Sequence, residues 1–241
     1  MTVPAAGEAR PRGRPKKAPE AIDEGNRRQE LLRAAARLFR HQGFAATTTR
    51  DIAAAAGMRA GSPFYHFETK AALLFAVVEQ GMRAALASQA RVLAALPARV
   101  EVETRLRALT RVHFDILLGP GSDFIPVMLY EWRSLDGHQR AAIARLQRDY
   151  ECAWADAIHA LHAQGRIGGQ ARLARLMILG ALNWSVQWYR AGQGATLDAL
   201  TDSAWLGDFA ARRVMGDVLA VRVPRVGIRI DRPGQERRVF R

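Results

Sequence analysis

The amino-acid sequence predicts an all-α protein in which a small N-terminal three-helix unit precedes a larger helical domain. Apolar residues first recur at helical spacing between residues 31 and 39. A glycine at position 57 then separates two short helical stretches, which is the arrangement of a helix-turn-helix. Beyond residue 90, each stretch between glycine or proline breaks has the length and apolar pattern of a helix. Since 49% of the 241 residues are apolar, the chain can bury the core that this fold needs.

The N-terminal region divides into an arm and the helix-turn-helix. Residues 1–25 contain four prolines and almost no large apolar residue, which predicts a disordered basic arm. Residues 26–72 form the helix-turn-helix domain. Its first helix ends at Gly43 and carries an apolar stripe made of Leu32, Ala35, Ala36 and Phe39.

Two threonines mark the starts of the following helices. The Thr48 hydroxyl is expected to cap the second helix while Asp51 reaches back to it, an aspartate version of the capping box. Gly57 supplies the turn, and a short helical stretch runs from about residue 59 to residue 67. Thr69 then caps a longer helix.

The larger domain is predicted to span residues 73–214, with Pro97 and several glycine-containing turns between its helices. The predicted helical segments are 101–118, 123–134, 138–164, 171–190 and 198–213. Residues 215–241 form a basic tail that we expect to be disordered. The alternation of Val, Ile and Arg in that tail also suits a short hairpin or an added attraction to DNA.

Charge divides the chain into cationic ends and a neutral centre. Lys and Arg outnumber Asp and Glu by 13 to 7 over residues 1–70 and by 9 to 3 over residues 211–241, against 14 to 13 between them. This distribution indicates that the ends meet a polyanion, either nucleic acid or an anionic membrane. No apolar run approaches a membrane span or a secretory signal, and the single cysteine, Cys152, fits a half-buried helix position. We therefore expect a cytoplasmic protein.

A longer motif sharpens the nucleic-acid prediction. It consists of Gly43-Phe44, Thr47-Thr48-Thr49-Arg50-Asp51-Ile52-Ala53, Gly57, Gly61-Ser62-Pro63-Phe64-Tyr65-His66-Phe67 and Lys70. Together these residues resemble the N-terminal domain of TetR-type transcriptional regulators over about residues 27–75. The resemblance implies a homodimer whose two helix-turn-helix units bind a palindromic operator in double-stranded DNA and repress transcription.

The predicted DNA contacts are of several kinds. Small residues at the start of the recognition helix permit close approach to base edges, where Arg59 and the serine of the motif can read sequence. Thr48 and Lys70 are expected to bind phosphates, and the resemblance adds Tyr65 and His66 at the DNA backbone. The sequence shows no packing role for Arg59, Tyr65 or Lys70, which favours function at these positions. With two arginines of the arm, the predicted set is Arg12, Arg14, Thr48, Arg50, Arg59, Ala60, Gly61, Ser62, Tyr65, His66 and Lys70.

Two residues depart from the family pattern. Arg59 stands where relatives usually carry a capping Ser or Thr, so it removes a cap and adds a cation near the groove. Pro63 occupies an apolar family position, so the recognition helix is expected to start late or to bend. In the arm, residues 12–17 resemble the core of an AT-hook, in which Arg-Gly-Arg inserts into an A·T-rich minor groove. An unspecific basic arm is the alternative.

The stretch from residue 176 to residue 189 is apolar on nearly every side. A helix sustains such a pattern only if both of its faces are covered, so one face is expected to meet its own core and the other a second subunit. The predicted dimerisation residues are Leu179, Leu182, Val186, Tyr189 and Trp205.

A second resemblance lies in the larger domain. The residues Glu131-Trp132-Arg133-Ser134-Leu135 and the run from Asn183 to Arg190 are similar to the C-terminal domain of TetR-type regulators of fatty-acid and sterol degradation. This resemblance implies a small hydrophobic effector such as an acyl-CoA thioester. The candidate contacts are polar residues set in apolar faces and their large neighbours: His113, Met128, Trp132, Asn183, Trp184 and Gln187. The alternatives are a core histidine with one backbone partner and ordinary core packing for the tryptophans.

No catalytic or metal-binding pattern competes with this interpretation. His159 and His162 lie one turn apart with Asp156 nearby, but no further ligand completes a zinc site and a solvated face is favoured. Asp149 and Glu151 lack a nucleophile motif, so no enzyme, cofactor or metal is predicted. The sequence thus predicts a sequence-specific repressor released by its effector. The alternatives are a ligand-independent architectural DNA-binding protein and an enzyme acting on CoA-linked substrates.

Overall fold

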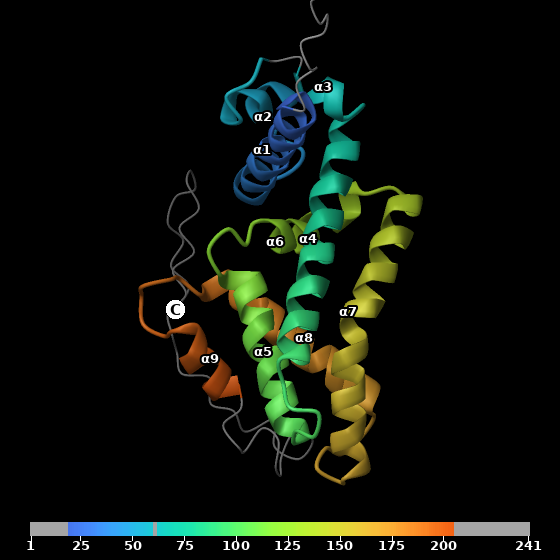
Figure 1. The fold of residues 1–241 in the computed structure, drawn as a ribbon. Coiled ribbons are helices and arrows are strands. Elements are labelled where there is room, and N and C mark those ends of the chain that lie inside the picture. Colours follow the sequence, from blue (N-terminus) through green and yellow to red (C-terminus); the bar gives the residue numbers. More distant parts are fainter. Residues whose placement is uncertain (1–18, 60–61, 205–241) are drawn as a thin grey trace, which may run out of the picture.

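The computed structural model describes residues 19–59 and 62–204, and all of the regular secondary structure in these residues is helical (Figure 1). The helices are α1 (Pro19–Gln42), α2 (Thr49–Ala55), α3 (Ser62–His66), α4 (Lys70–Ala94), α5 (Val102–Leu118), α6 (Phe124–Glu131), the 3₁₀ turn η1 (Trp132–Ser134), α7 (Gly137–Ala163), α8 (Ala171–Trp188) and α9 (Leu197–Ala204). No strand occurs in these residues, and the predicted all-α class is confirmed. Predictions for Arg12, Arg14, Ala60, Gly61, Trp205 and the basic tail lie outside the described residues.

The first three helices form one end of the molecule, and α4 joins that end to the larger domain (Figure 1). α4 packs against α1 as well as against α5, α6 and α7. The predicted domain boundary at residue 72 therefore falls in the first turn of a helix that both domains share. By length and composition α4 is apolar enough to cross a membrane, but its large apolar side chains lie in the core between these neighbours.

α1 begins earlier than predicted. Residues 19–25, which the sequence analysis assigned to the disordered arm, form the first turns of this helix. Proline, here Pro19, is favoured at the first helical position because its fixed φ suits the helix. The N–H that proline lacks would have no hydrogen-bond partner within the helix at this position. The prediction followed only the apolar stripe, and the buried part of that stripe begins at Leu31.

Short-range polar contacts set the starts of the helices in the small domain. The predicted capping box of α2 is confirmed: Thr48 Oγ1 accepts from the Asp51 amide at 3.1 Å, and Asp51 Oδ2 accepts from the Thr48 amide at 2.9 Å. Thr69 Oγ1 accepts from the Ala72 amide at 3.0 Å, which confirms the predicted cap of α4. Gly57, with a φ of 67°, makes the turn after α2.

The recognition helix α3 runs from Ser62 to His66, and Pro63, its second residue, is buried. Residues 60–61 lie outside the described residues, so the late start predicted from Pro63 stays a prediction. Proline is tolerated there because amides in the first helical turn have no partner within the helix. The Phe67 amide donates to the Pro63 carbonyl at 2.8 Å and closes the turn.

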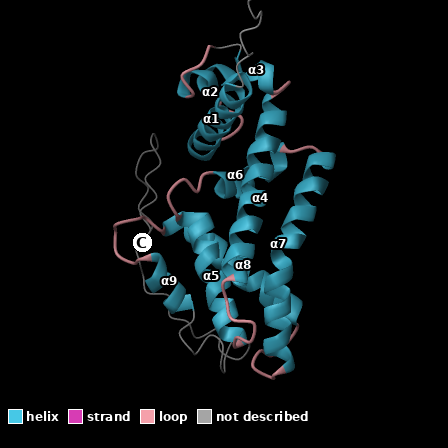
Figure 2. Ribbon diagram, viewed as in Figure 1, coloured by secondary structure: helices cyan, strands magenta, loops and turns pink. Residues whose placement is uncertain are grey.

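The core of the larger domain lies where α5 and α7 meet α4 and α8; Figure 2 shows this domain as helices joined by short loops. Trp154 of α7 is the largest fully buried side chain of the described residues. Cys152, two residues earlier, is exposed, so its predicted half-buried position is wrong. Two residues turn a helix through about 200°, which places Cys152 on the side opposite Trp154.

Candidate nucleic-acid interface and effector cavity

The predicted DNA-contacting residues within the described chain lie on α2, α3 and their connections. Arg50 on α2 and Arg59 in the connection to α3 are exposed. The Tyr65 side chain on α3 is 75% exposed, and the His66 ring stands edge-on to it with ring centroids 5.1 Å apart. These side chains contribute little to the core, so the structure leaves them at the surface where a DNA contact would need them. The contacts themselves stay predictions.

Thr48 is exposed, but its hydroxyl is engaged by Asp51. Besides accepting from the Asp51 amide, Oγ1 donates to Asp51 Oδ2 at 2.6 Å. Hydrogen bonds from the Thr48 side chain and backbone lower the pKa of the Asp51 carboxyl, so this group is charged at neutral pH. A phosphate that binds the Thr48 hydroxyl must therefore compete with a carboxylate for its proton.

Lys70 has a structural role that the sequence analysis missed. Its Nζ donates to the Phe44 carbonyl at 2.7 Å and to the Thr47 carbonyl at 2.8 Å, with the Ala45 carbonyl at 3.4 Å. It also lies 4.3 Å from the centre of the Phe44 ring, a cation–π distance. The prediction that Lys70 lacks a packing role is wrong, because its three N–H groups hold the loop between α1 and α2. Its contact with a phosphate stays a prediction.

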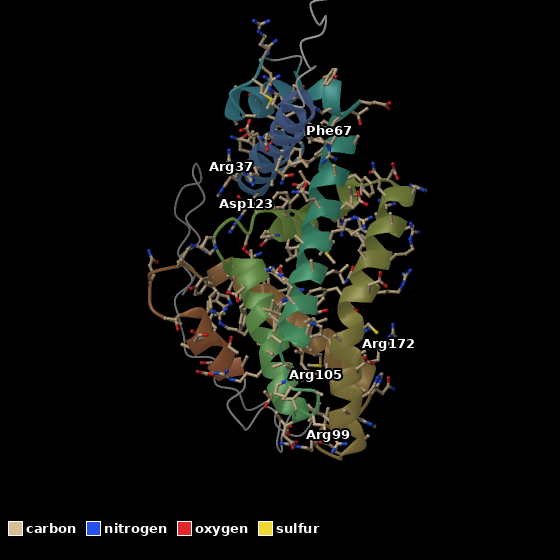
Figure 3. All side chains as sticks on the ribbon, viewed as in Figure 1. Arg37, Phe67, Arg99, Arg105, Asp123 and Arg172 are labelled. Atoms are coloured by element: carbon tan, nitrogen blue, oxygen red, sulfur yellow. The ribbon has the colours of Figure 1, made fainter. Side chains whose placement is uncertain are left out.

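The same loop is bound from the other side by the larger domain. The Phe44 amide donates to Glu131 Oε1 at 2.9 Å, and Glu131 Oε2 accepts from Ser134 Oγ at 3.0 Å. Arg40 near the end of α1 pairs with Asp123, which precedes α6, at 2.9 Å. Asp123, labelled in Figure 3, lies where the two domains meet. The backbone of Phe44 is thus held at its N–H by Glu131 of α6 and at its carbonyl by Lys70 of α4. Glu131 was predicted only as part of the resemblance over residues 131–135, so its contact with Phe44 was not expected.

A cavity of about 220 Å³ lies between α4, α5, α6, α7 and α8. Three of the six predicted effector residues line it, namely His113, Met128 and Asn183. Its walls also include Gln147, Tyr150 and Glu151 of α7, none of which was predicted to contact an effector. We call this space the effector cavity.

The other three predicted effector residues do not line this cavity. Trp184 is 64% exposed, and Gln187 is exposed and donates to Tyr130 Oη at 2.6 Å. Trp132 is half-buried against the core. Contact of these three side chains with an effector therefore stays a prediction that this cavity does not support. For Trp184 and Gln187, the sequence pattern of α8 did not distinguish its two apolar faces.

His113 forms the polar centre of the effector cavity. Its Nδ1 lies 2.9 Å from Tyr150 Oη and its Nε2 lies 3.1 Å from Asn183 Oδ1. An amide oxygen only accepts, so Nε2 carries the proton and the Tyr150 hydroxyl donates to Nδ1. Burial lowers the pKa of His113 to about 4, although the hydrogen bond to Asn183 acts in the opposite direction and raises it. The ring is therefore neutral at pH 7. The backbone-bonded alternative is wrong, because both partners are side chains.

Helix α8 presents an apolar face that no described residue covers. Leu173, Met177, Trp184 and Trp188, at helical spacing, are 49 to 64% exposed, and Leu176 flanks them. Of the predicted dimerisation residues, Leu179 and Leu182 are instead buried in the chain's own core. Val186 and Tyr189 are half-buried against that core. The prediction therefore named residues of the inner face of the helix, and the outer face is a different set.

Within the described residues, no group of three or more His, Cys, Asp or Glu side chains has the geometry of a metal site. His162, in the last turn of α7, is one of the two histidines considered above. Its Nε2 lies 2.8 Å from the carbonyl oxygen of Gly169, in the connection to α8.

Comparison with known proteins gives matches for both domains. Residues 31–77 match the family model of bacterial regulatory proteins of the tetR family, and residues 99–206 match that of the tetracyclin repressor-like C-terminal domain. The HTH-type transcriptional repressor KstR2 of Rhodococcus jostii is 28% identical over 189 residues, which are 77% of this chain and 91% of that protein.

Solved structures share the fold over most of both chains. AibR in complex with isovaleryl coenzyme A and operator DNA is 26% identical with a TM-score of 0.66, over 73% of this chain and 95% of AibR. The superantigen PfiT is 34% identical with a TM-score of 0.61, over 78% of this chain and 96% of PfiT.

Proposed function

The chain belongs to the TetR family of bacterial regulators, and on this premise we propose that it is a homodimeric repressor that a small hydrophobic effector releases from its operator. The observation that carries the proposal is the position of α6. This helix contributes Ile125 and Met128 to the wall of the effector cavity, and one turn later its Glu131 binds the Phe44 amide of the helix-turn-helix domain. A ligand site and a DNA-binding unit thus share one short helix.

On the DNA side, α3 enters the major groove of each half-site, with Arg59 at base edges and Tyr65 at the backbone. The exposed apolar face of α8 joins the two subunits, because its tryptophans and Met177 lie outside the chain's own core. A symmetric dimer of this kind requires a palindromic operator. The repressor acts in the cytoplasm, where that DNA lies.

We assign the effector to the acyl-CoA thioesters from the lining of the cavity. Most of its walls are apolar, including Met82, Leu117 and Ile125, and its lining contains no Lys or Arg but does contain Glu151. The cation nearest to Glu151 is Arg175, which already pairs with it at 3.4 Å and does not itself line the cavity. A free fatty acid would therefore bring a second carboxylate to compete for this one arginine, whereas a thioester brings a neutral carbonyl. About 220 Å³ holds an acyl group and leaves the nucleotide part of CoA outside. The bound isovaleryl coenzyme A of AibR is consistent with this class.

Release follows as a shift between two conformations. An acyl group in the cavity pushes on Ile125 and Met128, so that the conformation with α6 displaced binds the effector better. Displacing α6 loosens the bond from Glu131 to Phe44 and changes how α1 and α2 sit on α4. The loss of operator affinity equals the difference in effector affinity between the two conformations.

The proposal is tested by selecting bound sequences from a random DNA pool, with and without saturating isovaleryl-CoA or palmitoyl-CoA. We expect an enriched palindrome that is lost with one of the thioesters and retained with free CoA or the free acids. A palindrome indifferent to all of them removes the effector class and keeps the repressor. Enrichment that only tracks A·T content would support the architectural alternative.

A cavity-filling variant separates the two activities. Met128→Trp should bind the selected operator and lose at least about tenfold in its response to the thioester, because the indole occupies the acyl site. Tyr130→Trp is the matched control, since it places the same side chain on α6 at a residue that does not line the cavity. Equal responses in the two variants would contradict the assignment of the cavity.

A further inference from the structure

We propose a second ligand site in this protein, a cavity on the opposite flank of α8 from the effector cavity, which takes a small neutral apolar molecule. This cavity, of about 310 Å³, is bounded by α5, the end of α7, α8 and α9. Its volume lies within the usual range of small-molecule sites, roughly 300–1,000 Å³. We call it the α9 cavity. Nothing in the proposed repressor function requires it.

The walls of the α9 cavity belong to the core. Leu106 of α5 and Leu161 of α7 are each 1% exposed, and Ser185 of α8 is also 1% exposed. Leu182 and Leu200 complete the apolar floor. A space whose floor is formed by fully buried side chains is a gap in the packing between helices, and filling it restores the dispersion contacts that its walls otherwise lack.

The lining specifies a neutral ligand. It contains no charged residue, and its polar side chains are the three hydroxyls of Thr110, Ser185 and Ser203. Ser185 Oγ donates its proton to the Leu182 carbonyl at 2.6 Å, so it can only accept from a ligand. A charged group would lose its hydration here without a partner of opposite charge. The matching chemistry is a hydrocarbon skeleton with a hydroxyl group, such as a medium-chain or cyclic alcohol.

The open side of the cavity lies at the end of α9 and of α8. Ala204, the last described residue, lines the cavity. Trp188 forms the rim on the side of the exposed α8 face, so the opening lies next to the proposed dimer contact.

The two cavities share a wall. His113 of α5 and Asn183 of α8 line the effector cavity, while their chain neighbours Phe114 and Leu182 line the α9 cavity. The bond from His113 Nε2 to Asn183 Oδ1, at 3.1 Å, joins α5 to α8 at this wall. A ligand in the α9 cavity would thus change the distance between α5 and α8, the two helices that position His113 and its partner Asn183. Only this coupling rests on the proposed function.

The site is tested on the full chain with a neutral photoreactive probe, a decanol that carries a diazirine, followed by mapping of the labelled residues by mass spectrometry. We expect labelling on α5, α8 and α9 at residues of the α9 cavity. Decan-1-ol should compete at a concentration at least about tenfold lower than decanoate or decylammonium, because only the alcohol is neutral.

A variant identifies the site without relying on the effector. Ala181→Phe should remove the labels from the α9 cavity, because Ala181 lines that cavity and the added ring fills it. Met128→Trp, on the effector cavity, should leave those labels in place. The proposal is overturned if the natural chain shows no labels in the α9 cavity, which is the result expected if residues after 204 or a second copy of the chain fill this cavity. It is also overturned if decanoate and decylammonium compete as well as decan-1-ol. Neither result bears on operator release, since no DNA is used.

Discussion

The helix-turn-helix end and helix α8 are both built from short helical patterns, but different contacts determine their orientation. In the small domain, a threonine hydroxyl accepts from the backbone amide three residues later at the start of two helices: Thr48 from Asp51, and Thr69 from Ala72. In α8, apolar residues occur on nearly every side, and only the neighbouring helices decide which of them are buried. Local polar contacts can therefore be predicted from sequence, whereas the orientation of an apolar helix cannot.

The largest effect is expected from a charge on the outer face of α8. Trp184→Arg should convert the dimer to a monomer and weaken operator binding by at least about a hundredfold, because a monomer loses the linked second half-site. Sedimentation and operator titration measure the two effects. Cys152→Arg, which adds the same charge on an exposed position of α7, is the control and should change neither. A dimeric Trp184→Arg protein would place the subunit contact elsewhere.

The buried histidine of the effector cavity makes stability depend on pH. Since burial lowers the pKa of His113 from 6.5 to about 4, the unfolded chain binds its proton first as pH falls. The free energy of unfolding should then drop by about 3 kcal/mol between pH 6.5 and pH 4, at roughly 1.4 kcal/mol per pH unit. Urea unfolding of the natural chain and of His113→Gln checks this. The variant should lose less stability over the same range, and parallel curves would contradict the neutral, buried ring.

Lys70 provides a further test of this comparison. It makes contacts across more than 20 residues of the chain, whereas the capping contacts of the small domain join residues three apart. Lys70→Ala leaves the carbonyls of the α1–α2 loop without their donor and should lower the free energy of unfolding by about 1–3 kcal/mol. Arg59→Ala should change stability by less than about 0.5 kcal/mol, since Arg59 is exposed. Equal stabilities in urea would return Lys70 to a role in DNA binding alone.

The smallest expected change concerns the bond between the domains. Glu131→Ala removes the acceptor of the Phe44 amide, so exchange of that amide proton with solvent should become about tenfold faster, equivalent to about 1.4 kcal/mol. Glu131→Gln keeps an acceptor oxygen and should exchange nearly as slowly as the natural chain. Amide exchange followed by NMR distinguishes them. An unchanged exchange rate in Glu131→Ala would show that the Glu131 side chain does not hold the Phe44 amide, and would contradict the link between α6 and the small domain.

Much of the site could be predicted where a residue's role depends on near neighbours. The capping roles of Thr48 and Thr69 followed from spacing and backbone chemistry. Of the six predicted effector residues, His113 and Asn183, chosen as polar groups on apolar faces, and Met128, chosen as a large apolar neighbour, line one cavity. Tyr150, which binds His113 from another helix, and the structural role of Lys70 were missed, since each depends on a contact at least 23 residues away in the chain.

The sequence by itself determined the all-α class, the helix starts and the helix-turn-helix, because hydrophobic periodicity and capping act over one or two helical turns. Tertiary structure alone decided that Leu179 and Leu182 face inward while Trp184 and Trp188 face outward. It also decided that α6 contacts both the effector cavity and Phe44, and that two cavities flank α8. These features depend on how whole helices pack, and packing joins residues far apart in the chain by shape as well as by hydrophobicity.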